Sequence, residues 1–284
     1  MTKLLTIEKA VKDIKTLIEN AIKKNGVAGK NNLIRSQKPV CLLHDAAKAS
    51  FINLGVNPRC IKPAYLDHTE EQKLAGFFKF KDQDICLIPS NMLPHEETLV
   101  SKGMLDGVVD PYGYDLTEKI LSVNVRSQLS SISKNFDTLY ERTFAEALNL
   151  HKRCGKMVLG EFYMIPVYAY DGKAAKKKEV KFLKNKNVSK HIEKYILSFN
   201  ALNNRIPISN TDYRGEEFVY ERVCLLIVDF RFDNPKIYST NEELKRDGLL
   251  PQSTRASIDE MNFSSFASTL LSVYQDRFGK SNFK

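Results

Sequence analysis

Apolar residues recur every three or four positions in the first part of the chain. Between residues 7 and 24 this spacing predicts an amphipathic helix that ends near Gly26, with an apolar face formed by Ile7, Ala10, Val11, Ile14, Leu17, Ile18, Ala21 and Ile22. A second helix is expected over residues 39–54, because the helix-compatible run is closed by Gly55. The chain is therefore expected to begin with two helices.

The central part of the chain changes from helical to strand patterns. Residues 69–80 are expected to form a short third helix, because Thr69 and Gln72 have the spacing of a capping box. Segments rich in β-branched, aromatic and apolar residues then predict strands over residues 84–89, 119–128, 157–170 and 223–232. The last of these reads as a buried central strand.

Two further helices accompany these strands. Residues 137–151 have a helical pattern between the second and third strands, and residues 262–278 place Phe263, Phe266 and Leu270 on one face before a stop at Gly279. Strands embedded among helices at this spacing predict an α/β fold with a central mixed β-sheet flanked by helices. No repeat or linker divides the 284 residues, so a single domain is expected.

The net charge of the chain indicates which kind of molecule it binds. The chain has 43 Lys and Arg against 34 Asp and Glu, a net charge of +9, which favours a polyanion such as nucleic acid or an anionic membrane. Apolar runs such as residues 223–228 are much shorter than a membrane span, and the N-terminal residues lack the apolar stretch of a signal peptide. We therefore expect a cytoplasmic protein that does not insert into a membrane.

Several familiar kinds of site are not supported by the sequence. Five scattered cysteines without a C-x-x-C pair indicate reduced thiols, and five histidines lack the spacing of a zinc site. A phosphate loop of the G-x-x-x-x-G-K-[ST] type is also missing, which argues against an NTPase.

The strand over residues 119–128 carries the most distinctive polar pattern. Leu121, Val123 and Val125 alternate with a polar row, which consists of Ser122, Asn124, Arg126 and Gln128. The pattern alone favours a half-exposed strand with a solvated polar face. The order strand, polar turn, helix, strand that follows up to residue 166 gives the polar row a second possible meaning, because the same order surrounds nuclease active sites.

This block resembles the type II restriction endonucleases of the PD-(D/E)xK nuclease superfamily. The resemblance rests on N-V-R-S-Q-L-S-S from Asn124 and N-F-D-T-L-Y-E-R-T-F-A-E-A-L-N-L-H from Asn135, and extends over about residues 65–235. It implies a restriction-endonuclease-like domain over residues 1–284. Its parts would be a helical N-terminal part (1–65), a catalytic core (66–235) and a C-terminal helical part (236–284).

The resemblance also implies a Mg²⁺ site with catalytic residues on two strands. The family pattern is an acid at the start of one strand, then an acid and a lysine two positions apart on the next. Asp84 is the candidate for the first acid, and Asn124 and Arg126 occupy the other two positions. Asparagine can bind a metal through its carbonyl but brings no charge, and arginine stays protonated, so it can stabilise charge but cannot act as a base.

The carboxylate missing from position 124 must then come from elsewhere. In some relatives the following helix supplies it, and there Glu146 is preferred over Glu141, because Glu141 also fits a capping box. The expected catalytic set is Asp84, Asn124, Arg126 and Glu146, and the expected metal ligands are Asp84, Asn124 and Glu146. Glu71 is an outer candidate, and Asp106 and Asp110 are alternatives for the first acid, although a turn explains Asp110 better.

The partner implied by the resemblance is double-stranded DNA. The expected DNA contacts are Gln128, Lys134, Lys176 and Lys177. The last two belong to a basic run that a solvated loop explains equally well. Base specificity is expected from loops within residues 25–65 and 170–220.

The sequence is compatible with three interpretations of function. The leading one is a Mg²⁺-dependent, sequence-specific endonuclease that works as a homodimer, because a palindromic site mirrors a two-fold axis. The alternatives are a non-catalytic DNA-binding protein of the same fold and an unrelated basic α/β protein.

Overall fold

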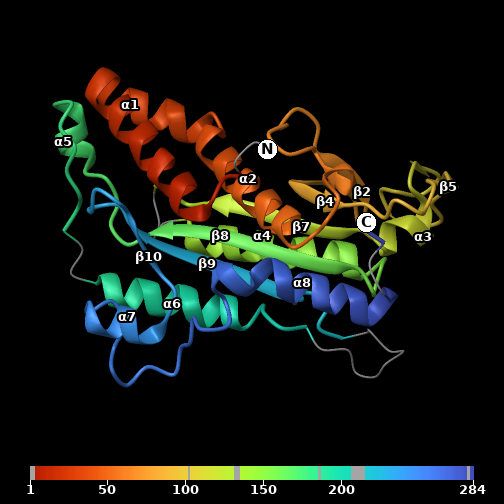
Figure 1. Ribbon diagram of the computed structural model, residues 1–284. Coiled ribbons are helices and arrows are strands. Elements are labelled where there is room, and N and C mark those ends of the chain that lie inside the picture. The colour runs from red at the N-terminus through yellow and green to blue at the C-terminus, as the bar shows by residue number, and fades with distance from the viewer. Residues whose placement is uncertain (1–3, 102, 131–134, 185–186, 206–214, 280–281) are drawn as a thin grey trace.

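The protein is built around a six-stranded mixed sheet. The computed structural model describes residues 4–284 except 102, 131–134, 185–186, 206–214 and 280–281. The strand order is β1–β4–β7–β8–β9–β10 (Figure 1). The strands are β1 (Ile61–Lys62), β4 (Ile85–Leu87), β7 (Leu121–Ser127), β8 (Val158–Pro166), β9 (Arg222–Asp229) and β10 (Lys236–Tyr238). The central strands β7, β8 and β9 are parallel, and the outer pairs are antiparallel.

Helices cover both faces of this sheet. The first face packs against α1 (Ile7–Arg35), α2 (Lys38–Asn53) and α8 (Phe263–Phe278). The second packs against α4 (Phe136–His151), α6 (Val188–Asn200) and α7 (Asn241–Arg246), as Figure 1 shows. The remaining helices are the 3-10 turn Pro58–Cys60, α3 (Gly113–Glu118) and α5 (Gly172–Lys176). The predicted α/β fold with a mixed sheet flanked by helices is confirmed.

The unit β7–α4–β8 follows the predicted order. Val123 and Val125 lie in the core beneath α1 and α2, as their alternation requires. The polar row on the other face of β7 is largely not solvated, however, and that expectation was wrong. Ser122 is 1% exposed and Asn124 is 4% exposed. These polar groups are therefore buried under a helix and are not in contact with water.

The C-terminal helix agrees with its sequence signals, whereas the N-terminal helix continues beyond its predicted end. The N-cap of α8 is Asn262, whose side chain accepts a hydrogen bond from the Ser265 N–H, and Gly279 follows the helix with a φ of 80°. In α1 the expected stop at Gly26 is a kink, where Asn25 and Gly26 leave helical geometry before the helix resumes. The sequence located the interruption but not the second half of the helix.

The helix expected over residues 69–80 is wrong. This segment forms a hairpin of β2 (Gln72–Ala75) and β3 (Phe80–Gln83). The N–H and hydroxyl of Thr69 donate to Asp67 Oδ1 at 3.0 and 2.7 Å, so Thr69 takes part in a turn and does not cap a helix. A second small hairpin, β5 (Glu97–Thr98) with β6 (Val109–Asp110), lies between β4 and α3 in the chain.

No helix within the described ranges is both long and apolar enough to cross a membrane.

Candidate active site

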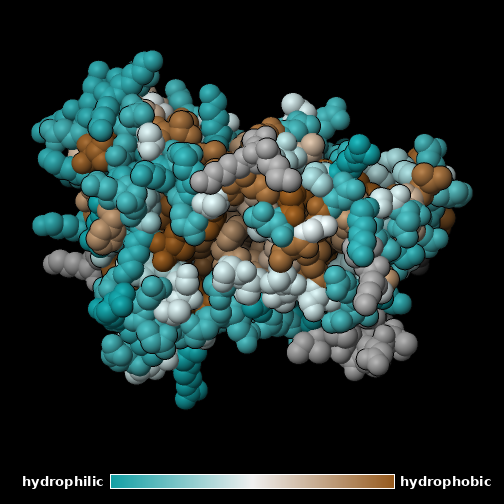
Figure 2. Space-filling model, viewed as in Figure 1, coloured by the Kyte–Doolittle hydropathy of each residue, from teal (hydrophilic) through white to brown (hydrophobic). Residues whose placement is uncertain are grey.

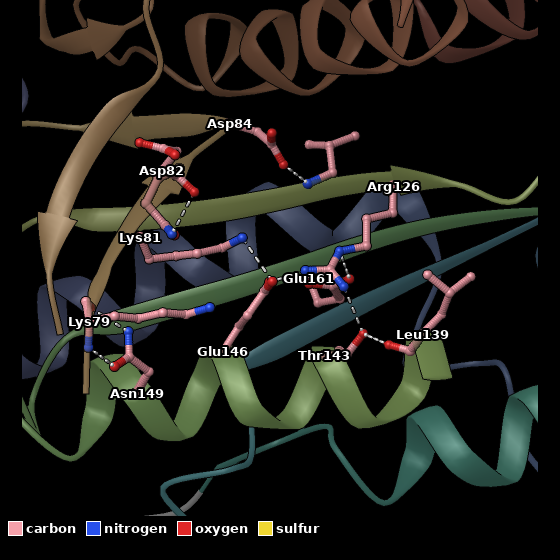
Figure 3. Close-up of polar contacts among 12 residues, drawn as sticks. Lys79, Lys81, Asp82, Asp84, Arg126, Leu139, Thr143, Glu146, Asn149 and Glu161 are labelled. Carbon is pink, nitrogen blue, oxygen red and sulfur yellow. Dashed lines mark hydrogen bonds and ion pairs between the residues drawn. The ribbon is translucent and has the colours of Figure 1, made fainter. Parts of the chain in front are cut away.

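The four residues expected to be catalytic line one pocket. Its volume is about 360 Å³, and it opens between β3, the end of β7 and α4, next to the turn between α1 and α2. The lining residues are Gln37, Glu71, Lys81, Asp82, Asp84, Asn124, Val125, Arg126, Leu139, Arg142 and Glu146. Figure 3 shows Asp84, Arg126 and Glu146 together with Lys81 and Asp82.

Asp84 is fixed by the antiparallel pairing of β4 with β7. The Val125 N–H donates to its Oδ2 at 2.6 Å, and Nε2 of the buried His44 lies 4.0 Å from its Oδ1. Burial raises the pKa of the Asp84 carboxyl to about 6, although the Val125 hydrogen bond opposes this rise. Burial also lowers the pKa of His44 to about 3, so the imidazole beside Asp84 is neutral at pH 7. Asp84 is thus a positioned carboxylate whose ionised form is poorly solvated.

Arg126 reaches from β7 into a gap between two carboxylates. Its guanidinium forms an ion pair with Glu146 of α4, and its Nε lies 3.3 Å from Glu161 Oε1 of β8. Its Nη1 also donates to the Thr143 hydroxyl at 3.2 Å. Burial by itself lowers the pKa of Arg126, but Glu161 and Glu146 outweigh burial and raise it. Arg126 is consequently a fixed cation at the wall of the pocket.

Glu161 is a buried acid that the sequence interpretation missed. It is fully buried and lies beside Asn124 in the parallel register of β7 and β8. Burial raises the pKa of Glu161 to about 8, against the attraction of Arg126. One signal was present, because a single acid within the apolar run Met157–Ile165 is unusual for a strand buried on both faces. Its contact with Arg126 gives it a positioning role.

Lys81 was missed as well. Its Nζ lies 2.8 Å from Glu146 Oε1, so that Glu146 faces one cation with each carboxylate oxygen (Figure 3). The wrong helix prediction hid this residue, since Lys81 reaches Glu146 only from a strand. The alternation F-K-F-K-D-Q over residues 78–83 is the sequence signal that indicates a strand here.

Asn149 holds the hairpin of Lys81 against α4. Its Oδ1 accepts hydrogen bonds from the N–H groups of Phe78 and Lys79 at 2.8 and 3.1 Å, and its Nδ2 donates to the Lys79 carbonyl at 3.0 Å. A Cβ at Gly76 would approach the Asn149 side chain within 2.2 Å, so the turn can close on the helix only with glycine there. Asn149 lies three residues after Glu146, on the same face of α4. The bonds of Asn149 therefore place Lys81 opposite Glu146.

The other candidate acids lie in different surroundings. Glu71 lines the pocket, whereas Glu141 is exposed on α4 and does not line it. Asp106 is exposed and accepts a hydrogen bond from the Ser101 N–H at 3.0 Å. Asp110 is fully buried, 2.7 Å from Arg153 Nη2, and accepts a hydrogen bond from the Tyr112 N–H at 3.1 Å. Asp110 thus has the turn role that the sequence favoured.

The expected DNA contacts are dispersed. Gln128 is 4% exposed, and its Oε1 accepts hydrogen bonds from the hydroxyls of Tyr163 and Tyr195, the former at 2.9 Å. Such a buried side chain cannot touch DNA in this arrangement, which removes it from the interface. Lys134 lies outside the described residues. Lys176 and Lys177 are exposed at the end of α5.

Oxygen donors dominate the pocket, as a Mg²⁺ site requires. Among the described residues, no group of three or more His, Cys, Asp and Glu side chains could hold a metal by itself. Mg²⁺ is commonly held by one or two carboxylates, waters and substrate phosphates, and Asp84 with Asn124 fits that donor set. Both Glu146 oxygens face cations, so Glu146 would have to leave Lys81 or Arg126 to bind a metal.

Comparisons of the chain with protein-family models, with curated proteins and with solved structures found no match.

Proposed function

We propose that this protein is a Mg²⁺-dependent endonuclease that hydrolyses phosphodiester bonds in double-stranded DNA at specific sequences, as type II restriction enzymes do. One observation carries the proposal. Asp84, Asn124, Arg126 and Glu146 were selected from a sequence resemblance, and they line a single pocket at the junction of β4, β7 and α4. The order of β7, α4 and β8, strand, helix and strand, is also the order expected from that resemblance.

Each side chain has a distinct role in the proposed reaction. Asp84 and Asn124 would hold the metal, with Glu146 or Glu71 as a further carboxylate. A bound Mg²⁺ would supply Lewis-acid polarisation of the scissile phosphate and a water of lowered pKa. The attacking water would lose one proton as its oxygen bonds to phosphorus, the bond from phosphorus to one deoxyribose oxygen would break, and that oxygen would take up one proton, so that the net reaction is hydrolysis by one water.

Arg126 and Lys81 would stabilise negative charge on the phosphate. Arg126, held by Glu146 and Glu161, is a fixed positive charge beside the position where negative charge develops during attack. Lys81 is a compact ammonium on a flexible stem, so it can turn from Glu146 toward a phosphate oxygen when DNA enters. The net charge of +9 favours DNA as the polyanion, and a homodimer would match the two-fold symmetry of a palindromic site.

Digestion of phage DNA tests this function. Wild-type protein with Mg²⁺ should give discrete bands on a gel, and EDTA should abolish them. A matched pair of variants localises the activity, because Asp84→Asn should be inactive and Glu141→Gln, on the exposed side of α4, should cut like wild type. Full activity in EDTA would contradict the proposal.

A second function is favoured by the cations around Glu146. Since Lys81 and Arg126 neutralise this carboxylate and position 124 is an asparagine, the same pocket suits a protein that binds DNA without cutting it. Gel shifts that weaken steeply with salt, without cleavage in Mg²⁺ or Mn²⁺, would identify this alternative.

A further inference from the structure

A second polar groove lies next to the proposed active pocket. Its volume is about 450 Å³, and its walls are the second half of α1, the residues that follow β7 and the segment around α5. The lining residues are Val27, Lys30, Asn31, Ile34, Arg35, Leu129, Ser130, Ala169, Tyr170, Gly172 and Leu183. We call this space the α1–α5 groove.

The α1–α5 groove carries positive charge. Lys30 is half-buried in its wall, and burial lowers the pKa of Lys30 although Asp171 opposes this. Arg35, in the last turn of α1, is exposed. Further lysines surround α5, namely Lys173, Lys176, Lys177, Lys178, Lys181 and Lys184. In Figure 2 the lobe formed by the far end of α1 and by α5, at the upper left, is mostly hydrophilic.

The acids near these lysines are already engaged. Asp171 accepts a hydrogen bond from the Lys173 N–H at the N-cap of α5, and Glu179 lies 2.6 Å from Lys181 Nζ. Within residues 171–184 they are the sole acids against six lysines. An anion that enters such a groove stabilises the charged form of a half-buried lysine more than that of an exposed one, because the anion replaces the lost solvation of the ammonium.

The active pocket and the α1–α5 groove are lined by neighbouring stretches of the chain at two places. Gln37 lines the pocket and lies two residues after Arg35 of the groove, while Arg126 of the pocket lies three residues before Leu129 of the groove. At about 3.5 Å per extended residue, the nearest lining residues of the two sites, Arg35 with Gln37 and Leu129 with Arg126, have Cα atoms at most roughly 7–11 Å apart. Phosphates of one DNA strand follow one another at a rise of only about 3.4 Å along the helix axis, so a duplex with a phosphate in the pocket also brings neighbouring phosphates close to the groove.

A glycine at the kink of α1 shapes the groove. Gly26 has a φ of 59°, and a Cβ at this position would lie 2.7 Å from the Ala175 carbonyl oxygen. Both the left-handed backbone and the close approach of α5 therefore require glycine. The kink redirects the second half of α1, and α5 packs against α1 with its backbone next to Gly26.

From these observations we infer that the α1–α5 groove binds the DNA backbone within a few nucleotides of the scissile phosphate. The inference rests on the proposed function for its choice of DNA as the polyanion. Lys30 and Arg35 are its phosphate contacts, and the lysines of α5 extend the contact along the duplex. The groove reads charge and not sequence, because its cations face phosphates and not base edges.

Binding of a fluorescein-labelled 30-bp duplex in EDTA, measured by anisotropy across a salt series, tests the inference without cleavage. The double variant Lys30→Ala/Arg35→Ala should bind roughly tenfold more weakly at 0.1 M salt. The slope of log K against log salt should fall by about 1.8, because about 0.9 is lost per phosphate contact.

The matched control is Lys9→Ala/Lys12→Ala, which removes the same charge from exposed positions on the same helix. These positions lie roughly 30 Å away along α1, several Debye lengths from the groove at 0.1 M salt. The control variant should bind like wild type, and both variants should melt at the wild-type temperature.

Each other outcome overturns the inference. Wild-type affinity of the Lys30/Arg35 variant would remove these cations from the interface, and equal weakening of both variants would indicate a net-charge effect. Plasmid cleavage in Mg²⁺ by the wild type is scored separately. The proposal for the groove can therefore be refuted even if the protein is an active nuclease. It can also be supported if the protein binds DNA without cutting it.

Discussion

Replacing Asp84 by asparagine should make the protein more stable while it destroys the proposed metal site. The carboxyl is fixed by the Val125 N–H, and burial raises its pKa from 3.8 to about 6. Because one pKa unit corresponds to about 1.4 kcal/mol, ionised Asp84 costs the folded state about 3 kcal/mol. Asparagine keeps an oxygen that can accept the Val125 hydrogen bond, and it carries no charge to bury.

The stabilisation should depend on pH in a defined direction. In the unfolded chain Asp84 loses its proton near pH 4, whereas in the folded protein it keeps this proton up to about pH 6. The folded state therefore binds more protons between these values, and the Asp84 contribution to stability falls as the pH rises through this window. The advantage of Asp84→Asn should be absent at pH 4 and complete above about pH 7.

Urea denaturation of the two proteins in EDTA, at pH 5 and pH 8, measures this difference. At pH 8 we expect Asp84→Asn to have a free energy of unfolding up to about 3 kcal/mol higher, or a Tm roughly 6–12 °C higher. Adding Mg²⁺ should stabilise the wild type but not the variant, because a ligand stabilises only the state that binds it. The exposed Glu141→Gln serves as the control and should match wild type throughout. An Asp84→Asn protein less stable than wild type at pH 8 would refute the reasoning.

Three further predictions concern buried charged side chains, two of them at the pocket and one at Glu221, which directly precedes β9 and contacts His151, Arg205 and Arg277. Glu146→Gln should lower DNA cleavage by about a hundredfold or more, whereas Glu141→Gln should leave the rate unchanged; the opposite order would reverse their roles. Arg126→Ala should lose both cleavage and stability in urea, because Glu161 would lose its cation and Glu146 would keep only Lys81, and Arg126→Lys should recover part of both; a harmless Ala variant would contradict this. Burial alone would raise the pKa of Glu221, but His151, Arg277 and Arg205 lower it to about 2. Its stabilisation is therefore present above about pH 4.5 and lost as the pH falls toward 2, and Glu221→Gln should cost about 3 kcal/mol or more at pH 7; an unchanged urea midpoint would rule this out.

The sequence predicted elements whose pattern is local and periodic. The order β7–α4–β8 could be predicted because alternation in the strand and the three-to-four spacing in the helix both follow the core. Asp84 and Asn124 could be assigned to one site from the family pattern, which has an acid at the start of one strand and further site residues on the next. The residues predicted from the sequence, Asp84, Asn124, Arg126 and Glu146, line one pocket.

What the sequence did not predict depends on contacts between distant segments. Thr69 and Gln72 gave a local helix signal, but the hairpin is fixed by Asn149, about 70 positions later in the chain. Lys81 could not be placed opposite Glu146 without that contact. Burial of the polar row on β7 likewise depends on how α4 crosses the sheet, which alternation within the strand does not encode.

The central claim is that the pocket around Asp84 hydrolyses DNA with the help of Mg²⁺, and the single-turnover cleavage rate as a function of Mg²⁺ concentration tests it most directly. Wild-type protein and Asp84→Asn are compared at pH 8 on the same end-labelled DNA, with EDTA as the zero point. The account predicts a rate that rises with Mg²⁺ and saturates for wild type, no cleavage in EDTA, and no detectable cleavage by Asp84→Asn at any Mg²⁺ concentration. Cleavage by Asp84→Asn at the wild-type rate, or a wild-type protein that cuts no DNA at any Mg²⁺ concentration, would contradict it.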